Sequence, residues 1–177
     1  EPLGPLIGTT PLSGAVDQGW STALDINNAG VIVGLSYFQQ PNFLPTHTTG
    51  WFFDPTVIPL QRTAMDTLDA RLALTPTQPW GWLDAVNDLG DLVGRRYATN
   101  SSTRLYLRRA SGQVDKLLEL SASSAYDGER FNIDAMNNRR EMVGYFLTNN
   151  AQRAALVRDR NSLPGGTPDT FDNFGLD

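Results

Sequence analysis

The sequence predicts an all-β protein made of three repeated antiparallel β-units, each with about four short strands. A motif that ends in Val-Gly occurs three times along the 177 residues, and 16 Gly and 11 Pro residues indicate many turns. Short apolar stretches also recur between turn signals, roughly every 8–12 residues, as in other all-β chains. Because a lone four-stranded sheet cannot bury both of its faces, the units are expected to pack against one another.

The repeated motif has the same length in its three copies. It reads LDINNAGVIVG over 24–34, DAVNDLGDLVG over 84–94 and DAMNNRREMVG over 134–144. Each copy predicts a β-hairpin, in which one strand ends on an aliphatic residue and a second strand runs to Val-Gly. Asn and Asp favour the turn because their side chains bond to nearby backbone groups. The predicted turn residues are Asn27, Asn28, Gly30, Asn87, Asp88, Gly90, Asn137, Asn138 and Arg140.

One turn position differs between the copies. Gly30 and Gly90 lie where a three-residue hairpin loop needs a positive φ, whereas the third copy has Arg140. Either Arg140 adopts the left-handed region or the third turn has another type. In the first case, Arg140→Gly is expected to stabilise the chain modestly.

The hairpins also predict core positions and the strands that follow. An aliphatic residue recurs at the same inward position, so six side chains are expected to be buried: Ile26, Val33, Val86, Val93, Met136 and Val143. A third strand is predicted at 50–53, 105–108 and 154–157, and a fourth at 57–60 and 114–120, with 2–7 as the matching strand from the N-terminal side. The only predicted helix is Ala64–Leu74.

These elements define a single repeat domain over 1–160, with copies at approximately 7–62, 78–120 and 121–160. The remaining residues, 161–177, are rich in Pro, Gly and Asp and are predicted to be an exposed tail. Three architectures fit three units: a pseudo-threefold, prism-like assembly, a six-bladed propeller formed by dimerisation, or part of a longer propeller. The prism-like assembly is preferred.

The pattern Ala-x-x-Ile-Asn-Asn-x-Gly-x-x-Val-Gly at 23–34, followed by the aromatic strand at 50–53, resembles the HAF-type extracellular repeats of bacterial secreted proteins. The second copy keeps the Asn-Asp pair, the turn glycine and Val-Gly, and the third lacks the turn glycine. The leading His of that family is replaced by Thr49, Arg104 and Arg153. The resemblance implies an extracellular or periplasmic repeat protein. A first residue of Glu1 agrees with removal of a secretion signal.

Composition disfavours several classes of function. A net charge of −5 provides no basic face for nucleic acid, and no apolar run reaches the roughly 20 residues that span a membrane. The chain has no Cys and one histidine, His47, in a predicted polar loop at 44–48 without a Gly-x-Ser-x-Gly context. We therefore predict no catalytic residue, metal site or cofactor.

Two residue types remain as candidates for a binding site. Asp84 and Asp134 share one repeat position, but equivalent positions are expected to lie apart, which makes a glycoside hydrolase-like enzyme only a minor alternative. Three tryptophans precede the first two hairpins, where they either fill the space between sheets or stack on a sugar ring: Trp20, Trp80 and Trp82. The sequence thus predicts a secreted non-enzymatic binding module with a glycan or protein partner. The alternative is a structural protein that packs against copies of itself as a homo-oligomer.

Overall fold

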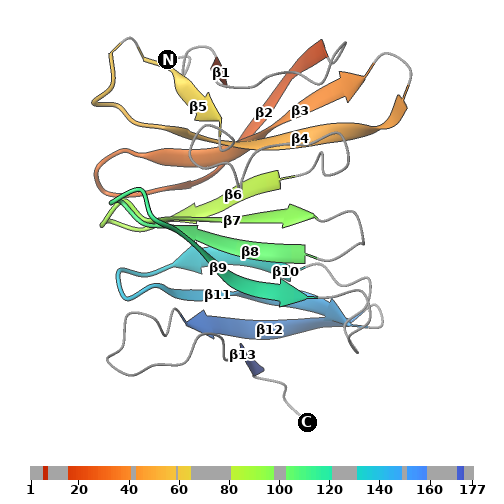
Figure 1. Ribbon diagram of the computed structural model, residues 1–177, viewed down its shortest axis with the longest axis vertical. Helices are drawn as coiled ribbons and strands as arrows, with labels where there is room; N and C mark the ends of the chain where they lie inside the picture. Colours follow the sequence, from red (N-terminus) through yellow and green to blue (C-terminus); the bar gives the residue numbers. More distant parts are fainter. Residues whose placement is uncertain are drawn as a thin grey trace.

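The computed structural model describes residues 6–7, 16–40, 43–58, 60–64, 81–97, 103–120, 131–148, 151–158 and 171–173. Within these residues thirteen strands form three sheets, and no helix occurs. The all-β prediction is therefore confirmed. The sheets follow one another from the top to the bottom of Figure 1 in sequence order. The segment predicted as a helix lies outside the described residues except for Ala64, which belongs to a strand.

The first sheet has the strand order β1-β5-β4-β3-β2. Neighbouring strands are antiparallel, except that β1 pairs with β5 in parallel. The N-terminal residues Leu6 and Ile7 thus join this sheet as a fifth strand rather than as the missing fourth strand of another unit. The bounds are Leu6–Ile7 for β1, Val16–Ile26 for β2, Ile32–Gln40 for β3, Phe43–Phe53 for β4 and Arg62–Ala64 for β5.

The second and third sheets each have four antiparallel strands in sequence order. In the second sheet β6 is Gly81–Val86, β7 is Leu92–Tyr97, β8 is Thr103–Arg108 and β9 is Val114–Leu120. In the third sheet β10 is Phe131–Met136, β11 is Glu141–Thr148, β12 is Ala151–Arg158 and β13 is Phe171–Asn173. The last strand comes from the segment predicted as a tail, and it pairs with β12.

The predicted fourth strand at 57–60 and the predicted loop around His47 are both wrong. Val57 and Ile58 lie in an exposed bend, because Asp54 forms a turn in which its carbonyl accepts from Val57 and its carboxylate accepts from Thr56. The strand begins later, at Arg62. His47 lies within β4, where its backbone pairs with Phe38.

The hydrophobic core lies between the sheets. Val33 of the first sheet packs with residues of the second sheet that include Val86, and a second cluster joins the second sheet to the third. The central sheet is therefore covered on both faces, and Val93 and Leu107 are completely buried. In the second sheet the first strand, β6, contacts β2, the first strand of the first sheet, and β10, the first strand of the third sheet. The first strands of neighbouring sheets therefore lie next to each other.

The prediction of six equivalent buried residues is correct for four and wrong for two. Val33, Val86, Val93 and Met136 are buried, but Ile26 is 61% exposed and Val143 is 48% exposed. Both exceptions belong to the outer sheets. Val86, the counterpart of Ile26, packs toward the preceding sheet, and Val93, the counterpart of Val143, packs toward the following sheet. Ile26 has no sheet before it and Val143 has none after it within the described residues.

The three hairpin turns share one hydrogen-bond pattern. In the first turn the Asn27 N–H donates to the Val31 carbonyl, and the Asn27 side-chain oxygen accepts from the N–H groups of Ala29 and Val31. Asn87 and Asn137 form the corresponding bonds in their turns. Gly30 and Gly90 have φ values of 81° and 80°, and Arg140 has 60°. Arg140 therefore adopts the left-handed region, which is the first of the two alternatives.

The same asparagines link neighbouring sheets. The side-chain N–H of Asn27 donates to the Asn87 carbonyl at 2.9 Å, and that of Asn87 donates to the Asn137 carbonyl at 3.3 Å. At the next position, the Asn28 N–H donates to the Asp88 carboxylate and the Asp88 N–H donates to the Asn138 side chain, each at 2.9 Å. These four bonds form two parallel series, which we call the asparagine ladder. The ladder fixes the relative position of the three turns.

Candidate ligand-binding site at the β-bulges

Each first strand carries a β-bulge at the same position. Opposite the Val-Gly of the second strand, the pairing skips Leu24 in β2, Asp84 in β6 and Asp134 in β10. A bulge leaves one residue outside the ladder and redirects its side chain. A Cβ on Gly34, Gly94 or Gly144 would collide with a backbone oxygen of the paired strand, at Thr22, Trp82 and Asn132 respectively. The terminal glycine of the motif is thus required by the close approach of the two strands.

The three bulge residues line one pocket of about 260 Å³, which we call the bulge pocket. Its walls come from all three sheets. The lining residues are Leu24, Leu35, Trp82, Asp84, Arg95, Asn132, Ile133, Asp134 and Tyr145. The expectation that Asp84 and Asp134 lie apart is therefore wrong, because β6 and β10 are adjacent and their bulges coincide.

The floor of the bulge pocket is a buried ion pair. The Arg95 guanidinium donates to both oxygens of Asp84, at 2.8 and 2.7 Å, and to the Asn132 side-chain oxygen at 2.6 Å. Burial raises the pKa of Asp84, the Arg95 charge opposes that rise, and the nearby Asp134 carboxylate adds to it. Because both oxygens of Asp84 are bonded to Arg95, this carboxylate has a structural role in the pocket rather than that of a free acid or nucleophile.

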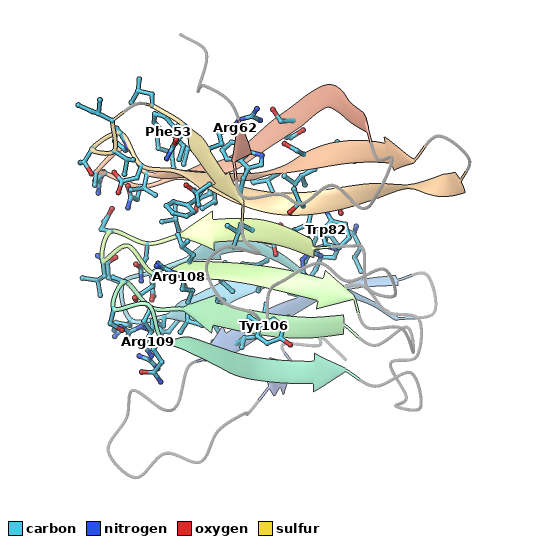
Figure 2. All side chains as sticks on the ribbon, turned by 45° about the horizontal axis from the view of Figure 1, so that its top comes forward. Phe53, Arg62, Trp82, Tyr106, Arg108 and Arg109 are labelled. Atoms are coloured by element: carbon cyan, nitrogen blue, oxygen red, sulfur yellow. The ribbon has the colours of Figure 1, made fainter. Side chains whose placement is uncertain are left out.

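Aromatic and polar groups surround this floor. The Arg95 guanidinium lies 5.1 Å from the centroid of the Trp82 ring, a cation–π distance, which holds the partly buried ring in place. Tyr145 is half-buried and Asp134 is exposed. Figure 2 shows Trp82 at the start of β6, away from the hairpin turns, whereas Arg108 and Arg109 lie at the turn end of the second sheet. The bulge pocket therefore lies farther along the strands, away from the hairpin turns that carry the asparagine ladder.

The predicted tryptophan site is only partly described. Trp82 lines the bulge pocket. Trp20 lies in β2, where its backbone pairs with Tyr37, but its side chain is outside the described residues, as is the whole of Trp80. Sequence reasoning missed Arg95, Asn132 and Tyr145. One available signal was the acidic residue at the same position of two largely apolar strands, Asp84 and Asp134, directly opposite the Val-Gly pair.

The pocket contains the Arg95–Asp84 ion pair, the carboxylate of Asp134, which is unpaired within the described residues, and the aromatic side chains of Trp82 and Tyr145. Arg95 and Asp84 compensate each other, so Asp134 leaves the lining with a net negative charge. Among the described residues no group of three His, Asp or Glu side chains is arranged to hold a metal ion. Nor does the described part of the chain contain a helix with the length and apolarity needed to cross a membrane.

The sequence was compared with family models and with curated proteins. No family model matches it, and no curated protein matches it.

Proposed function

We propose that this chain is a secreted, non-enzymatic binding module and that the bulge pocket binds a sugar ring of a glycan. The observation that supports this is the convergence of Trp82, Tyr145 and the Asp134 carboxylate on one pocket of about 260 Å³. Ligand sites typically combine apolar and aromatic walls with a few polar groups that fix the orientation. The proposed location, extracellular or periplasmic, rests on the resemblance to HAF-type repeats.

The chemistry of the lining suits a neutral polyhydroxyl ligand. Carboxylate and amide oxygens accept hydrogen bonds from hydroxyl groups, and Asp134 is exposed at the pocket and makes no ion pair within the described residues. The aromatic rings of Trp82 and Tyr145 offer apolar surface for the C–H groups of a sugar ring. An anionic ligand is disfavoured because Asp84 already neutralises Arg95.

An enzymatic use of the two carboxylates is less favoured by the same contacts. A glycoside hydrolase needs one carboxyl group that can donate a proton and a second that acts as a base or nucleophile. Asp84 is 4% exposed, and both of its oxygens are bonded to Arg95. It has no free oxygen to present to a substrate, so we propose binding without turnover.

A glycan array with the purified chain, followed by calorimetry on the best ligand, tests this proposal. Asp134→Asn is expected to weaken binding about tenfold or more, because the charged acceptor is replaced by a neutral amide oxygen, which accepts a weaker hydrogen bond. Asp134 is exposed, so its replacement should leave the melting temperature unchanged. The control is Arg139→Ala at the turn end, where the side chain is 81% exposed. The proposal fails if no glycan binds, or if Asp134→Asn and Tyr145→Ala both bind as tightly as the control.

A further inference from the structure

The outer faces of the first and third sheets expose several residues whose counterparts are buried in the contacts between neighbouring sheets. Each sheet presents one set of residues to the preceding sheet and another set to the following sheet. In the second sheet both sets are buried. In the first sheet the set that would meet a preceding sheet is open near the hairpin turn, at Ala23 and Ile26, whereas Trp51, the counterpart of Tyr106, is buried. In the third sheet the set that would meet a following sheet is open.

The open side of the third sheet, which we call the third-sheet end face, is apolar and hollowed. A depression of about 430 Å³ is lined by residues that include Ala135, Val143 and Leu156. Their counterparts in the second sheet are Ala85, Val93 and Leu107, which are completely buried against the third sheet. The open side of the first sheet, the first-sheet end face, carries Ala23, Ile26 and Ile32, of which Ala23 and Ile26 are exposed and Ile32 is half-buried.

The ladder also ends on matching groups. Each Asn side-chain amide has two N–H bonds, and Asn87 uses one on Asp91 of its own turn and one on the next carbonyl. Asn137 donates to Glu141 of its own turn at 2.7 Å, which leaves its second N–H for a further sheet. At the other end, the Asn27 carbonyl accepts from the Gly30 N–H but has no counterpart of the bond that Asn87 and Asn137 receive from a preceding sheet.

We propose that the third-sheet end face binds the first-sheet end face of a second copy of this chain, head to tail. The Asn137 side chain of one copy then donates to the Asn27 carbonyl of the other, as Asn87 already donates to Asn137. The exposed Asn138 N–H meets the Asn28 side-chain oxygen, in the way that the Asp88 N–H meets Asn138. Ile26 enters the depression next to Val143, as Val86 packs toward Val33 between the first two sheets. The contact thus continues an interface that the chain already forms twice.

Two charge variants, alone and mixed, test this arrangement by size-exclusion chromatography with light scattering. The unmodified chain is expected to have twice the mass of one chain or more, depending on whether the head-to-tail contact closes into a ring. Val143→Asp and Ile26→Asp should each weaken association about 30-fold or more, as loss of a central apolar contact does. An equimolar mixture should re-form a dimer, because each variant retains the face that the other has lost.

The controls separate the contact from folding and from ligand binding. Leu89→Asp changes a side chain of similar exposure, 54%, in the turn of the central sheet, and is expected to leave the mass unchanged. Asp134→Asn should also leave it unchanged, since the bulge pocket is not part of either end face. A monomeric unmodified chain at high concentration overturns the proposal. So does a mixture that stays monomeric, or an Ile26→Asp variant that still forms a full dimer, because a symmetric contact between two third-sheet end faces would give that result.

Discussion

Substitutions of Arg140 can separate the destabilisation caused by its left-handed backbone conformation from the stabilisation contributed by its ion pair with Asp91. Arg140 has a φ of 60°, and its Nε donates to the Asp91 carboxylate of the neighbouring sheet at 2.8 Å. The Arg140 side chain is 21% exposed and that of Asp91 is 2% exposed. A hydrogen bond with charged partners contributes about 1.5–3 kcal/mol, and a left-handed non-glycine residue costs about 1–2 kcal/mol. The bond therefore offsets the strain.

Two substitutions measure these two contributions. Arg140→Ala keeps the strained backbone and loses the bond, so the free energy of unfolding should fall by about 2 kcal/mol. Arg140→Gly loses the same bond but relieves the strain, so it should fall by about 1 kcal/mol. The ion pair thus reverses the sign expected from the sequence, which predicts that Arg140→Gly stabilises the chain. Urea denaturation of both variants measures the difference, with Arg139→Ala as a control that should change stability by less than about 0.5 kcal/mol.

The pH dependence of the Arg140→Ala penalty provides an independent check. Burial alone would raise the pKa of Asp91, but bonds from the Ala110 N–H, the Asn87 amide and Arg140 outweigh it and lower the pKa. A lowered pKa in the folded state means that the stabilisation is complete above the ordinary pKa and is lost as the pH falls through the folded value. The penalty should therefore shrink below about pH 4. A more stable Arg140→Gly variant, or a penalty that is constant from neutral pH to pH 3, would refute the ion-pair argument.

Three further predictions concern the ladder, the bulge and the pocket floor. Asn87→Ala removes three bonds within the turn and one bond to the third sheet, so the unfolding free energy should fall by about 2–4 kcal/mol. Asn28→Ala on the exposed outer series should cost less than half of that in the same urea titration. Gly94→Ala places a Cβ against the Trp82 carbonyl and should lower the melting temperature by several degrees, while Ser111→Ala in an exposed turn should leave it unchanged; equal melting temperatures would mean that the bulge is absent. Asp84→Ala leaves the Arg95 guanidinium buried without its carboxylate and should cost about 3–5 kcal/mol, most of which the double variant with Arg95→Met should recover if the loss arises from the unpaired charge.

The sequence predicts local features of this fold better than its long-range features. The hairpins at Asn27, Asn87 and Asn137 were predictable because an Asn that accepts from two N–H groups of its own turn needs no distant partner. The strand Val114–Leu120 was predicted with its observed bounds. In contrast, apolar content predicted a strand at 57–60, although the Asp54 turn places Val57 and Ile58 in a bend outside the sheet.

The candidate site and the end faces depend on neighbours that a local pattern does not contain. Ile26 and Val86 occupy the same motif position, yet one is 61% exposed and the other 4%, because only Val86 has a sheet on that side within the described residues. The meeting of Asp84 and Asp134 depends on the adjacency of β6 and β10. Arg95 could not be predicted as a site residue from the repeat. The position that directly follows Val-Gly holds Leu35 in the first copy and Tyr145 in the third, so no side-chain chemistry is shared there.

The asparagine ladder has a consequence for how such a chain tolerates changes in length. Its rungs join residues 60 positions apart between the first two turns and 50 apart between the last two, yet the bonds are of the same kind. The ten-residue difference is therefore accommodated away from the ladder, and the first sheet does have longer strands, with 11 residues in β2 against 6 in β6. Insertions at the strand ends opposite the hairpin turns should therefore leave the spacing of the turns unchanged. New peptide segments can be inserted there while the hydrogen-bonded turns keep the three sheets in register.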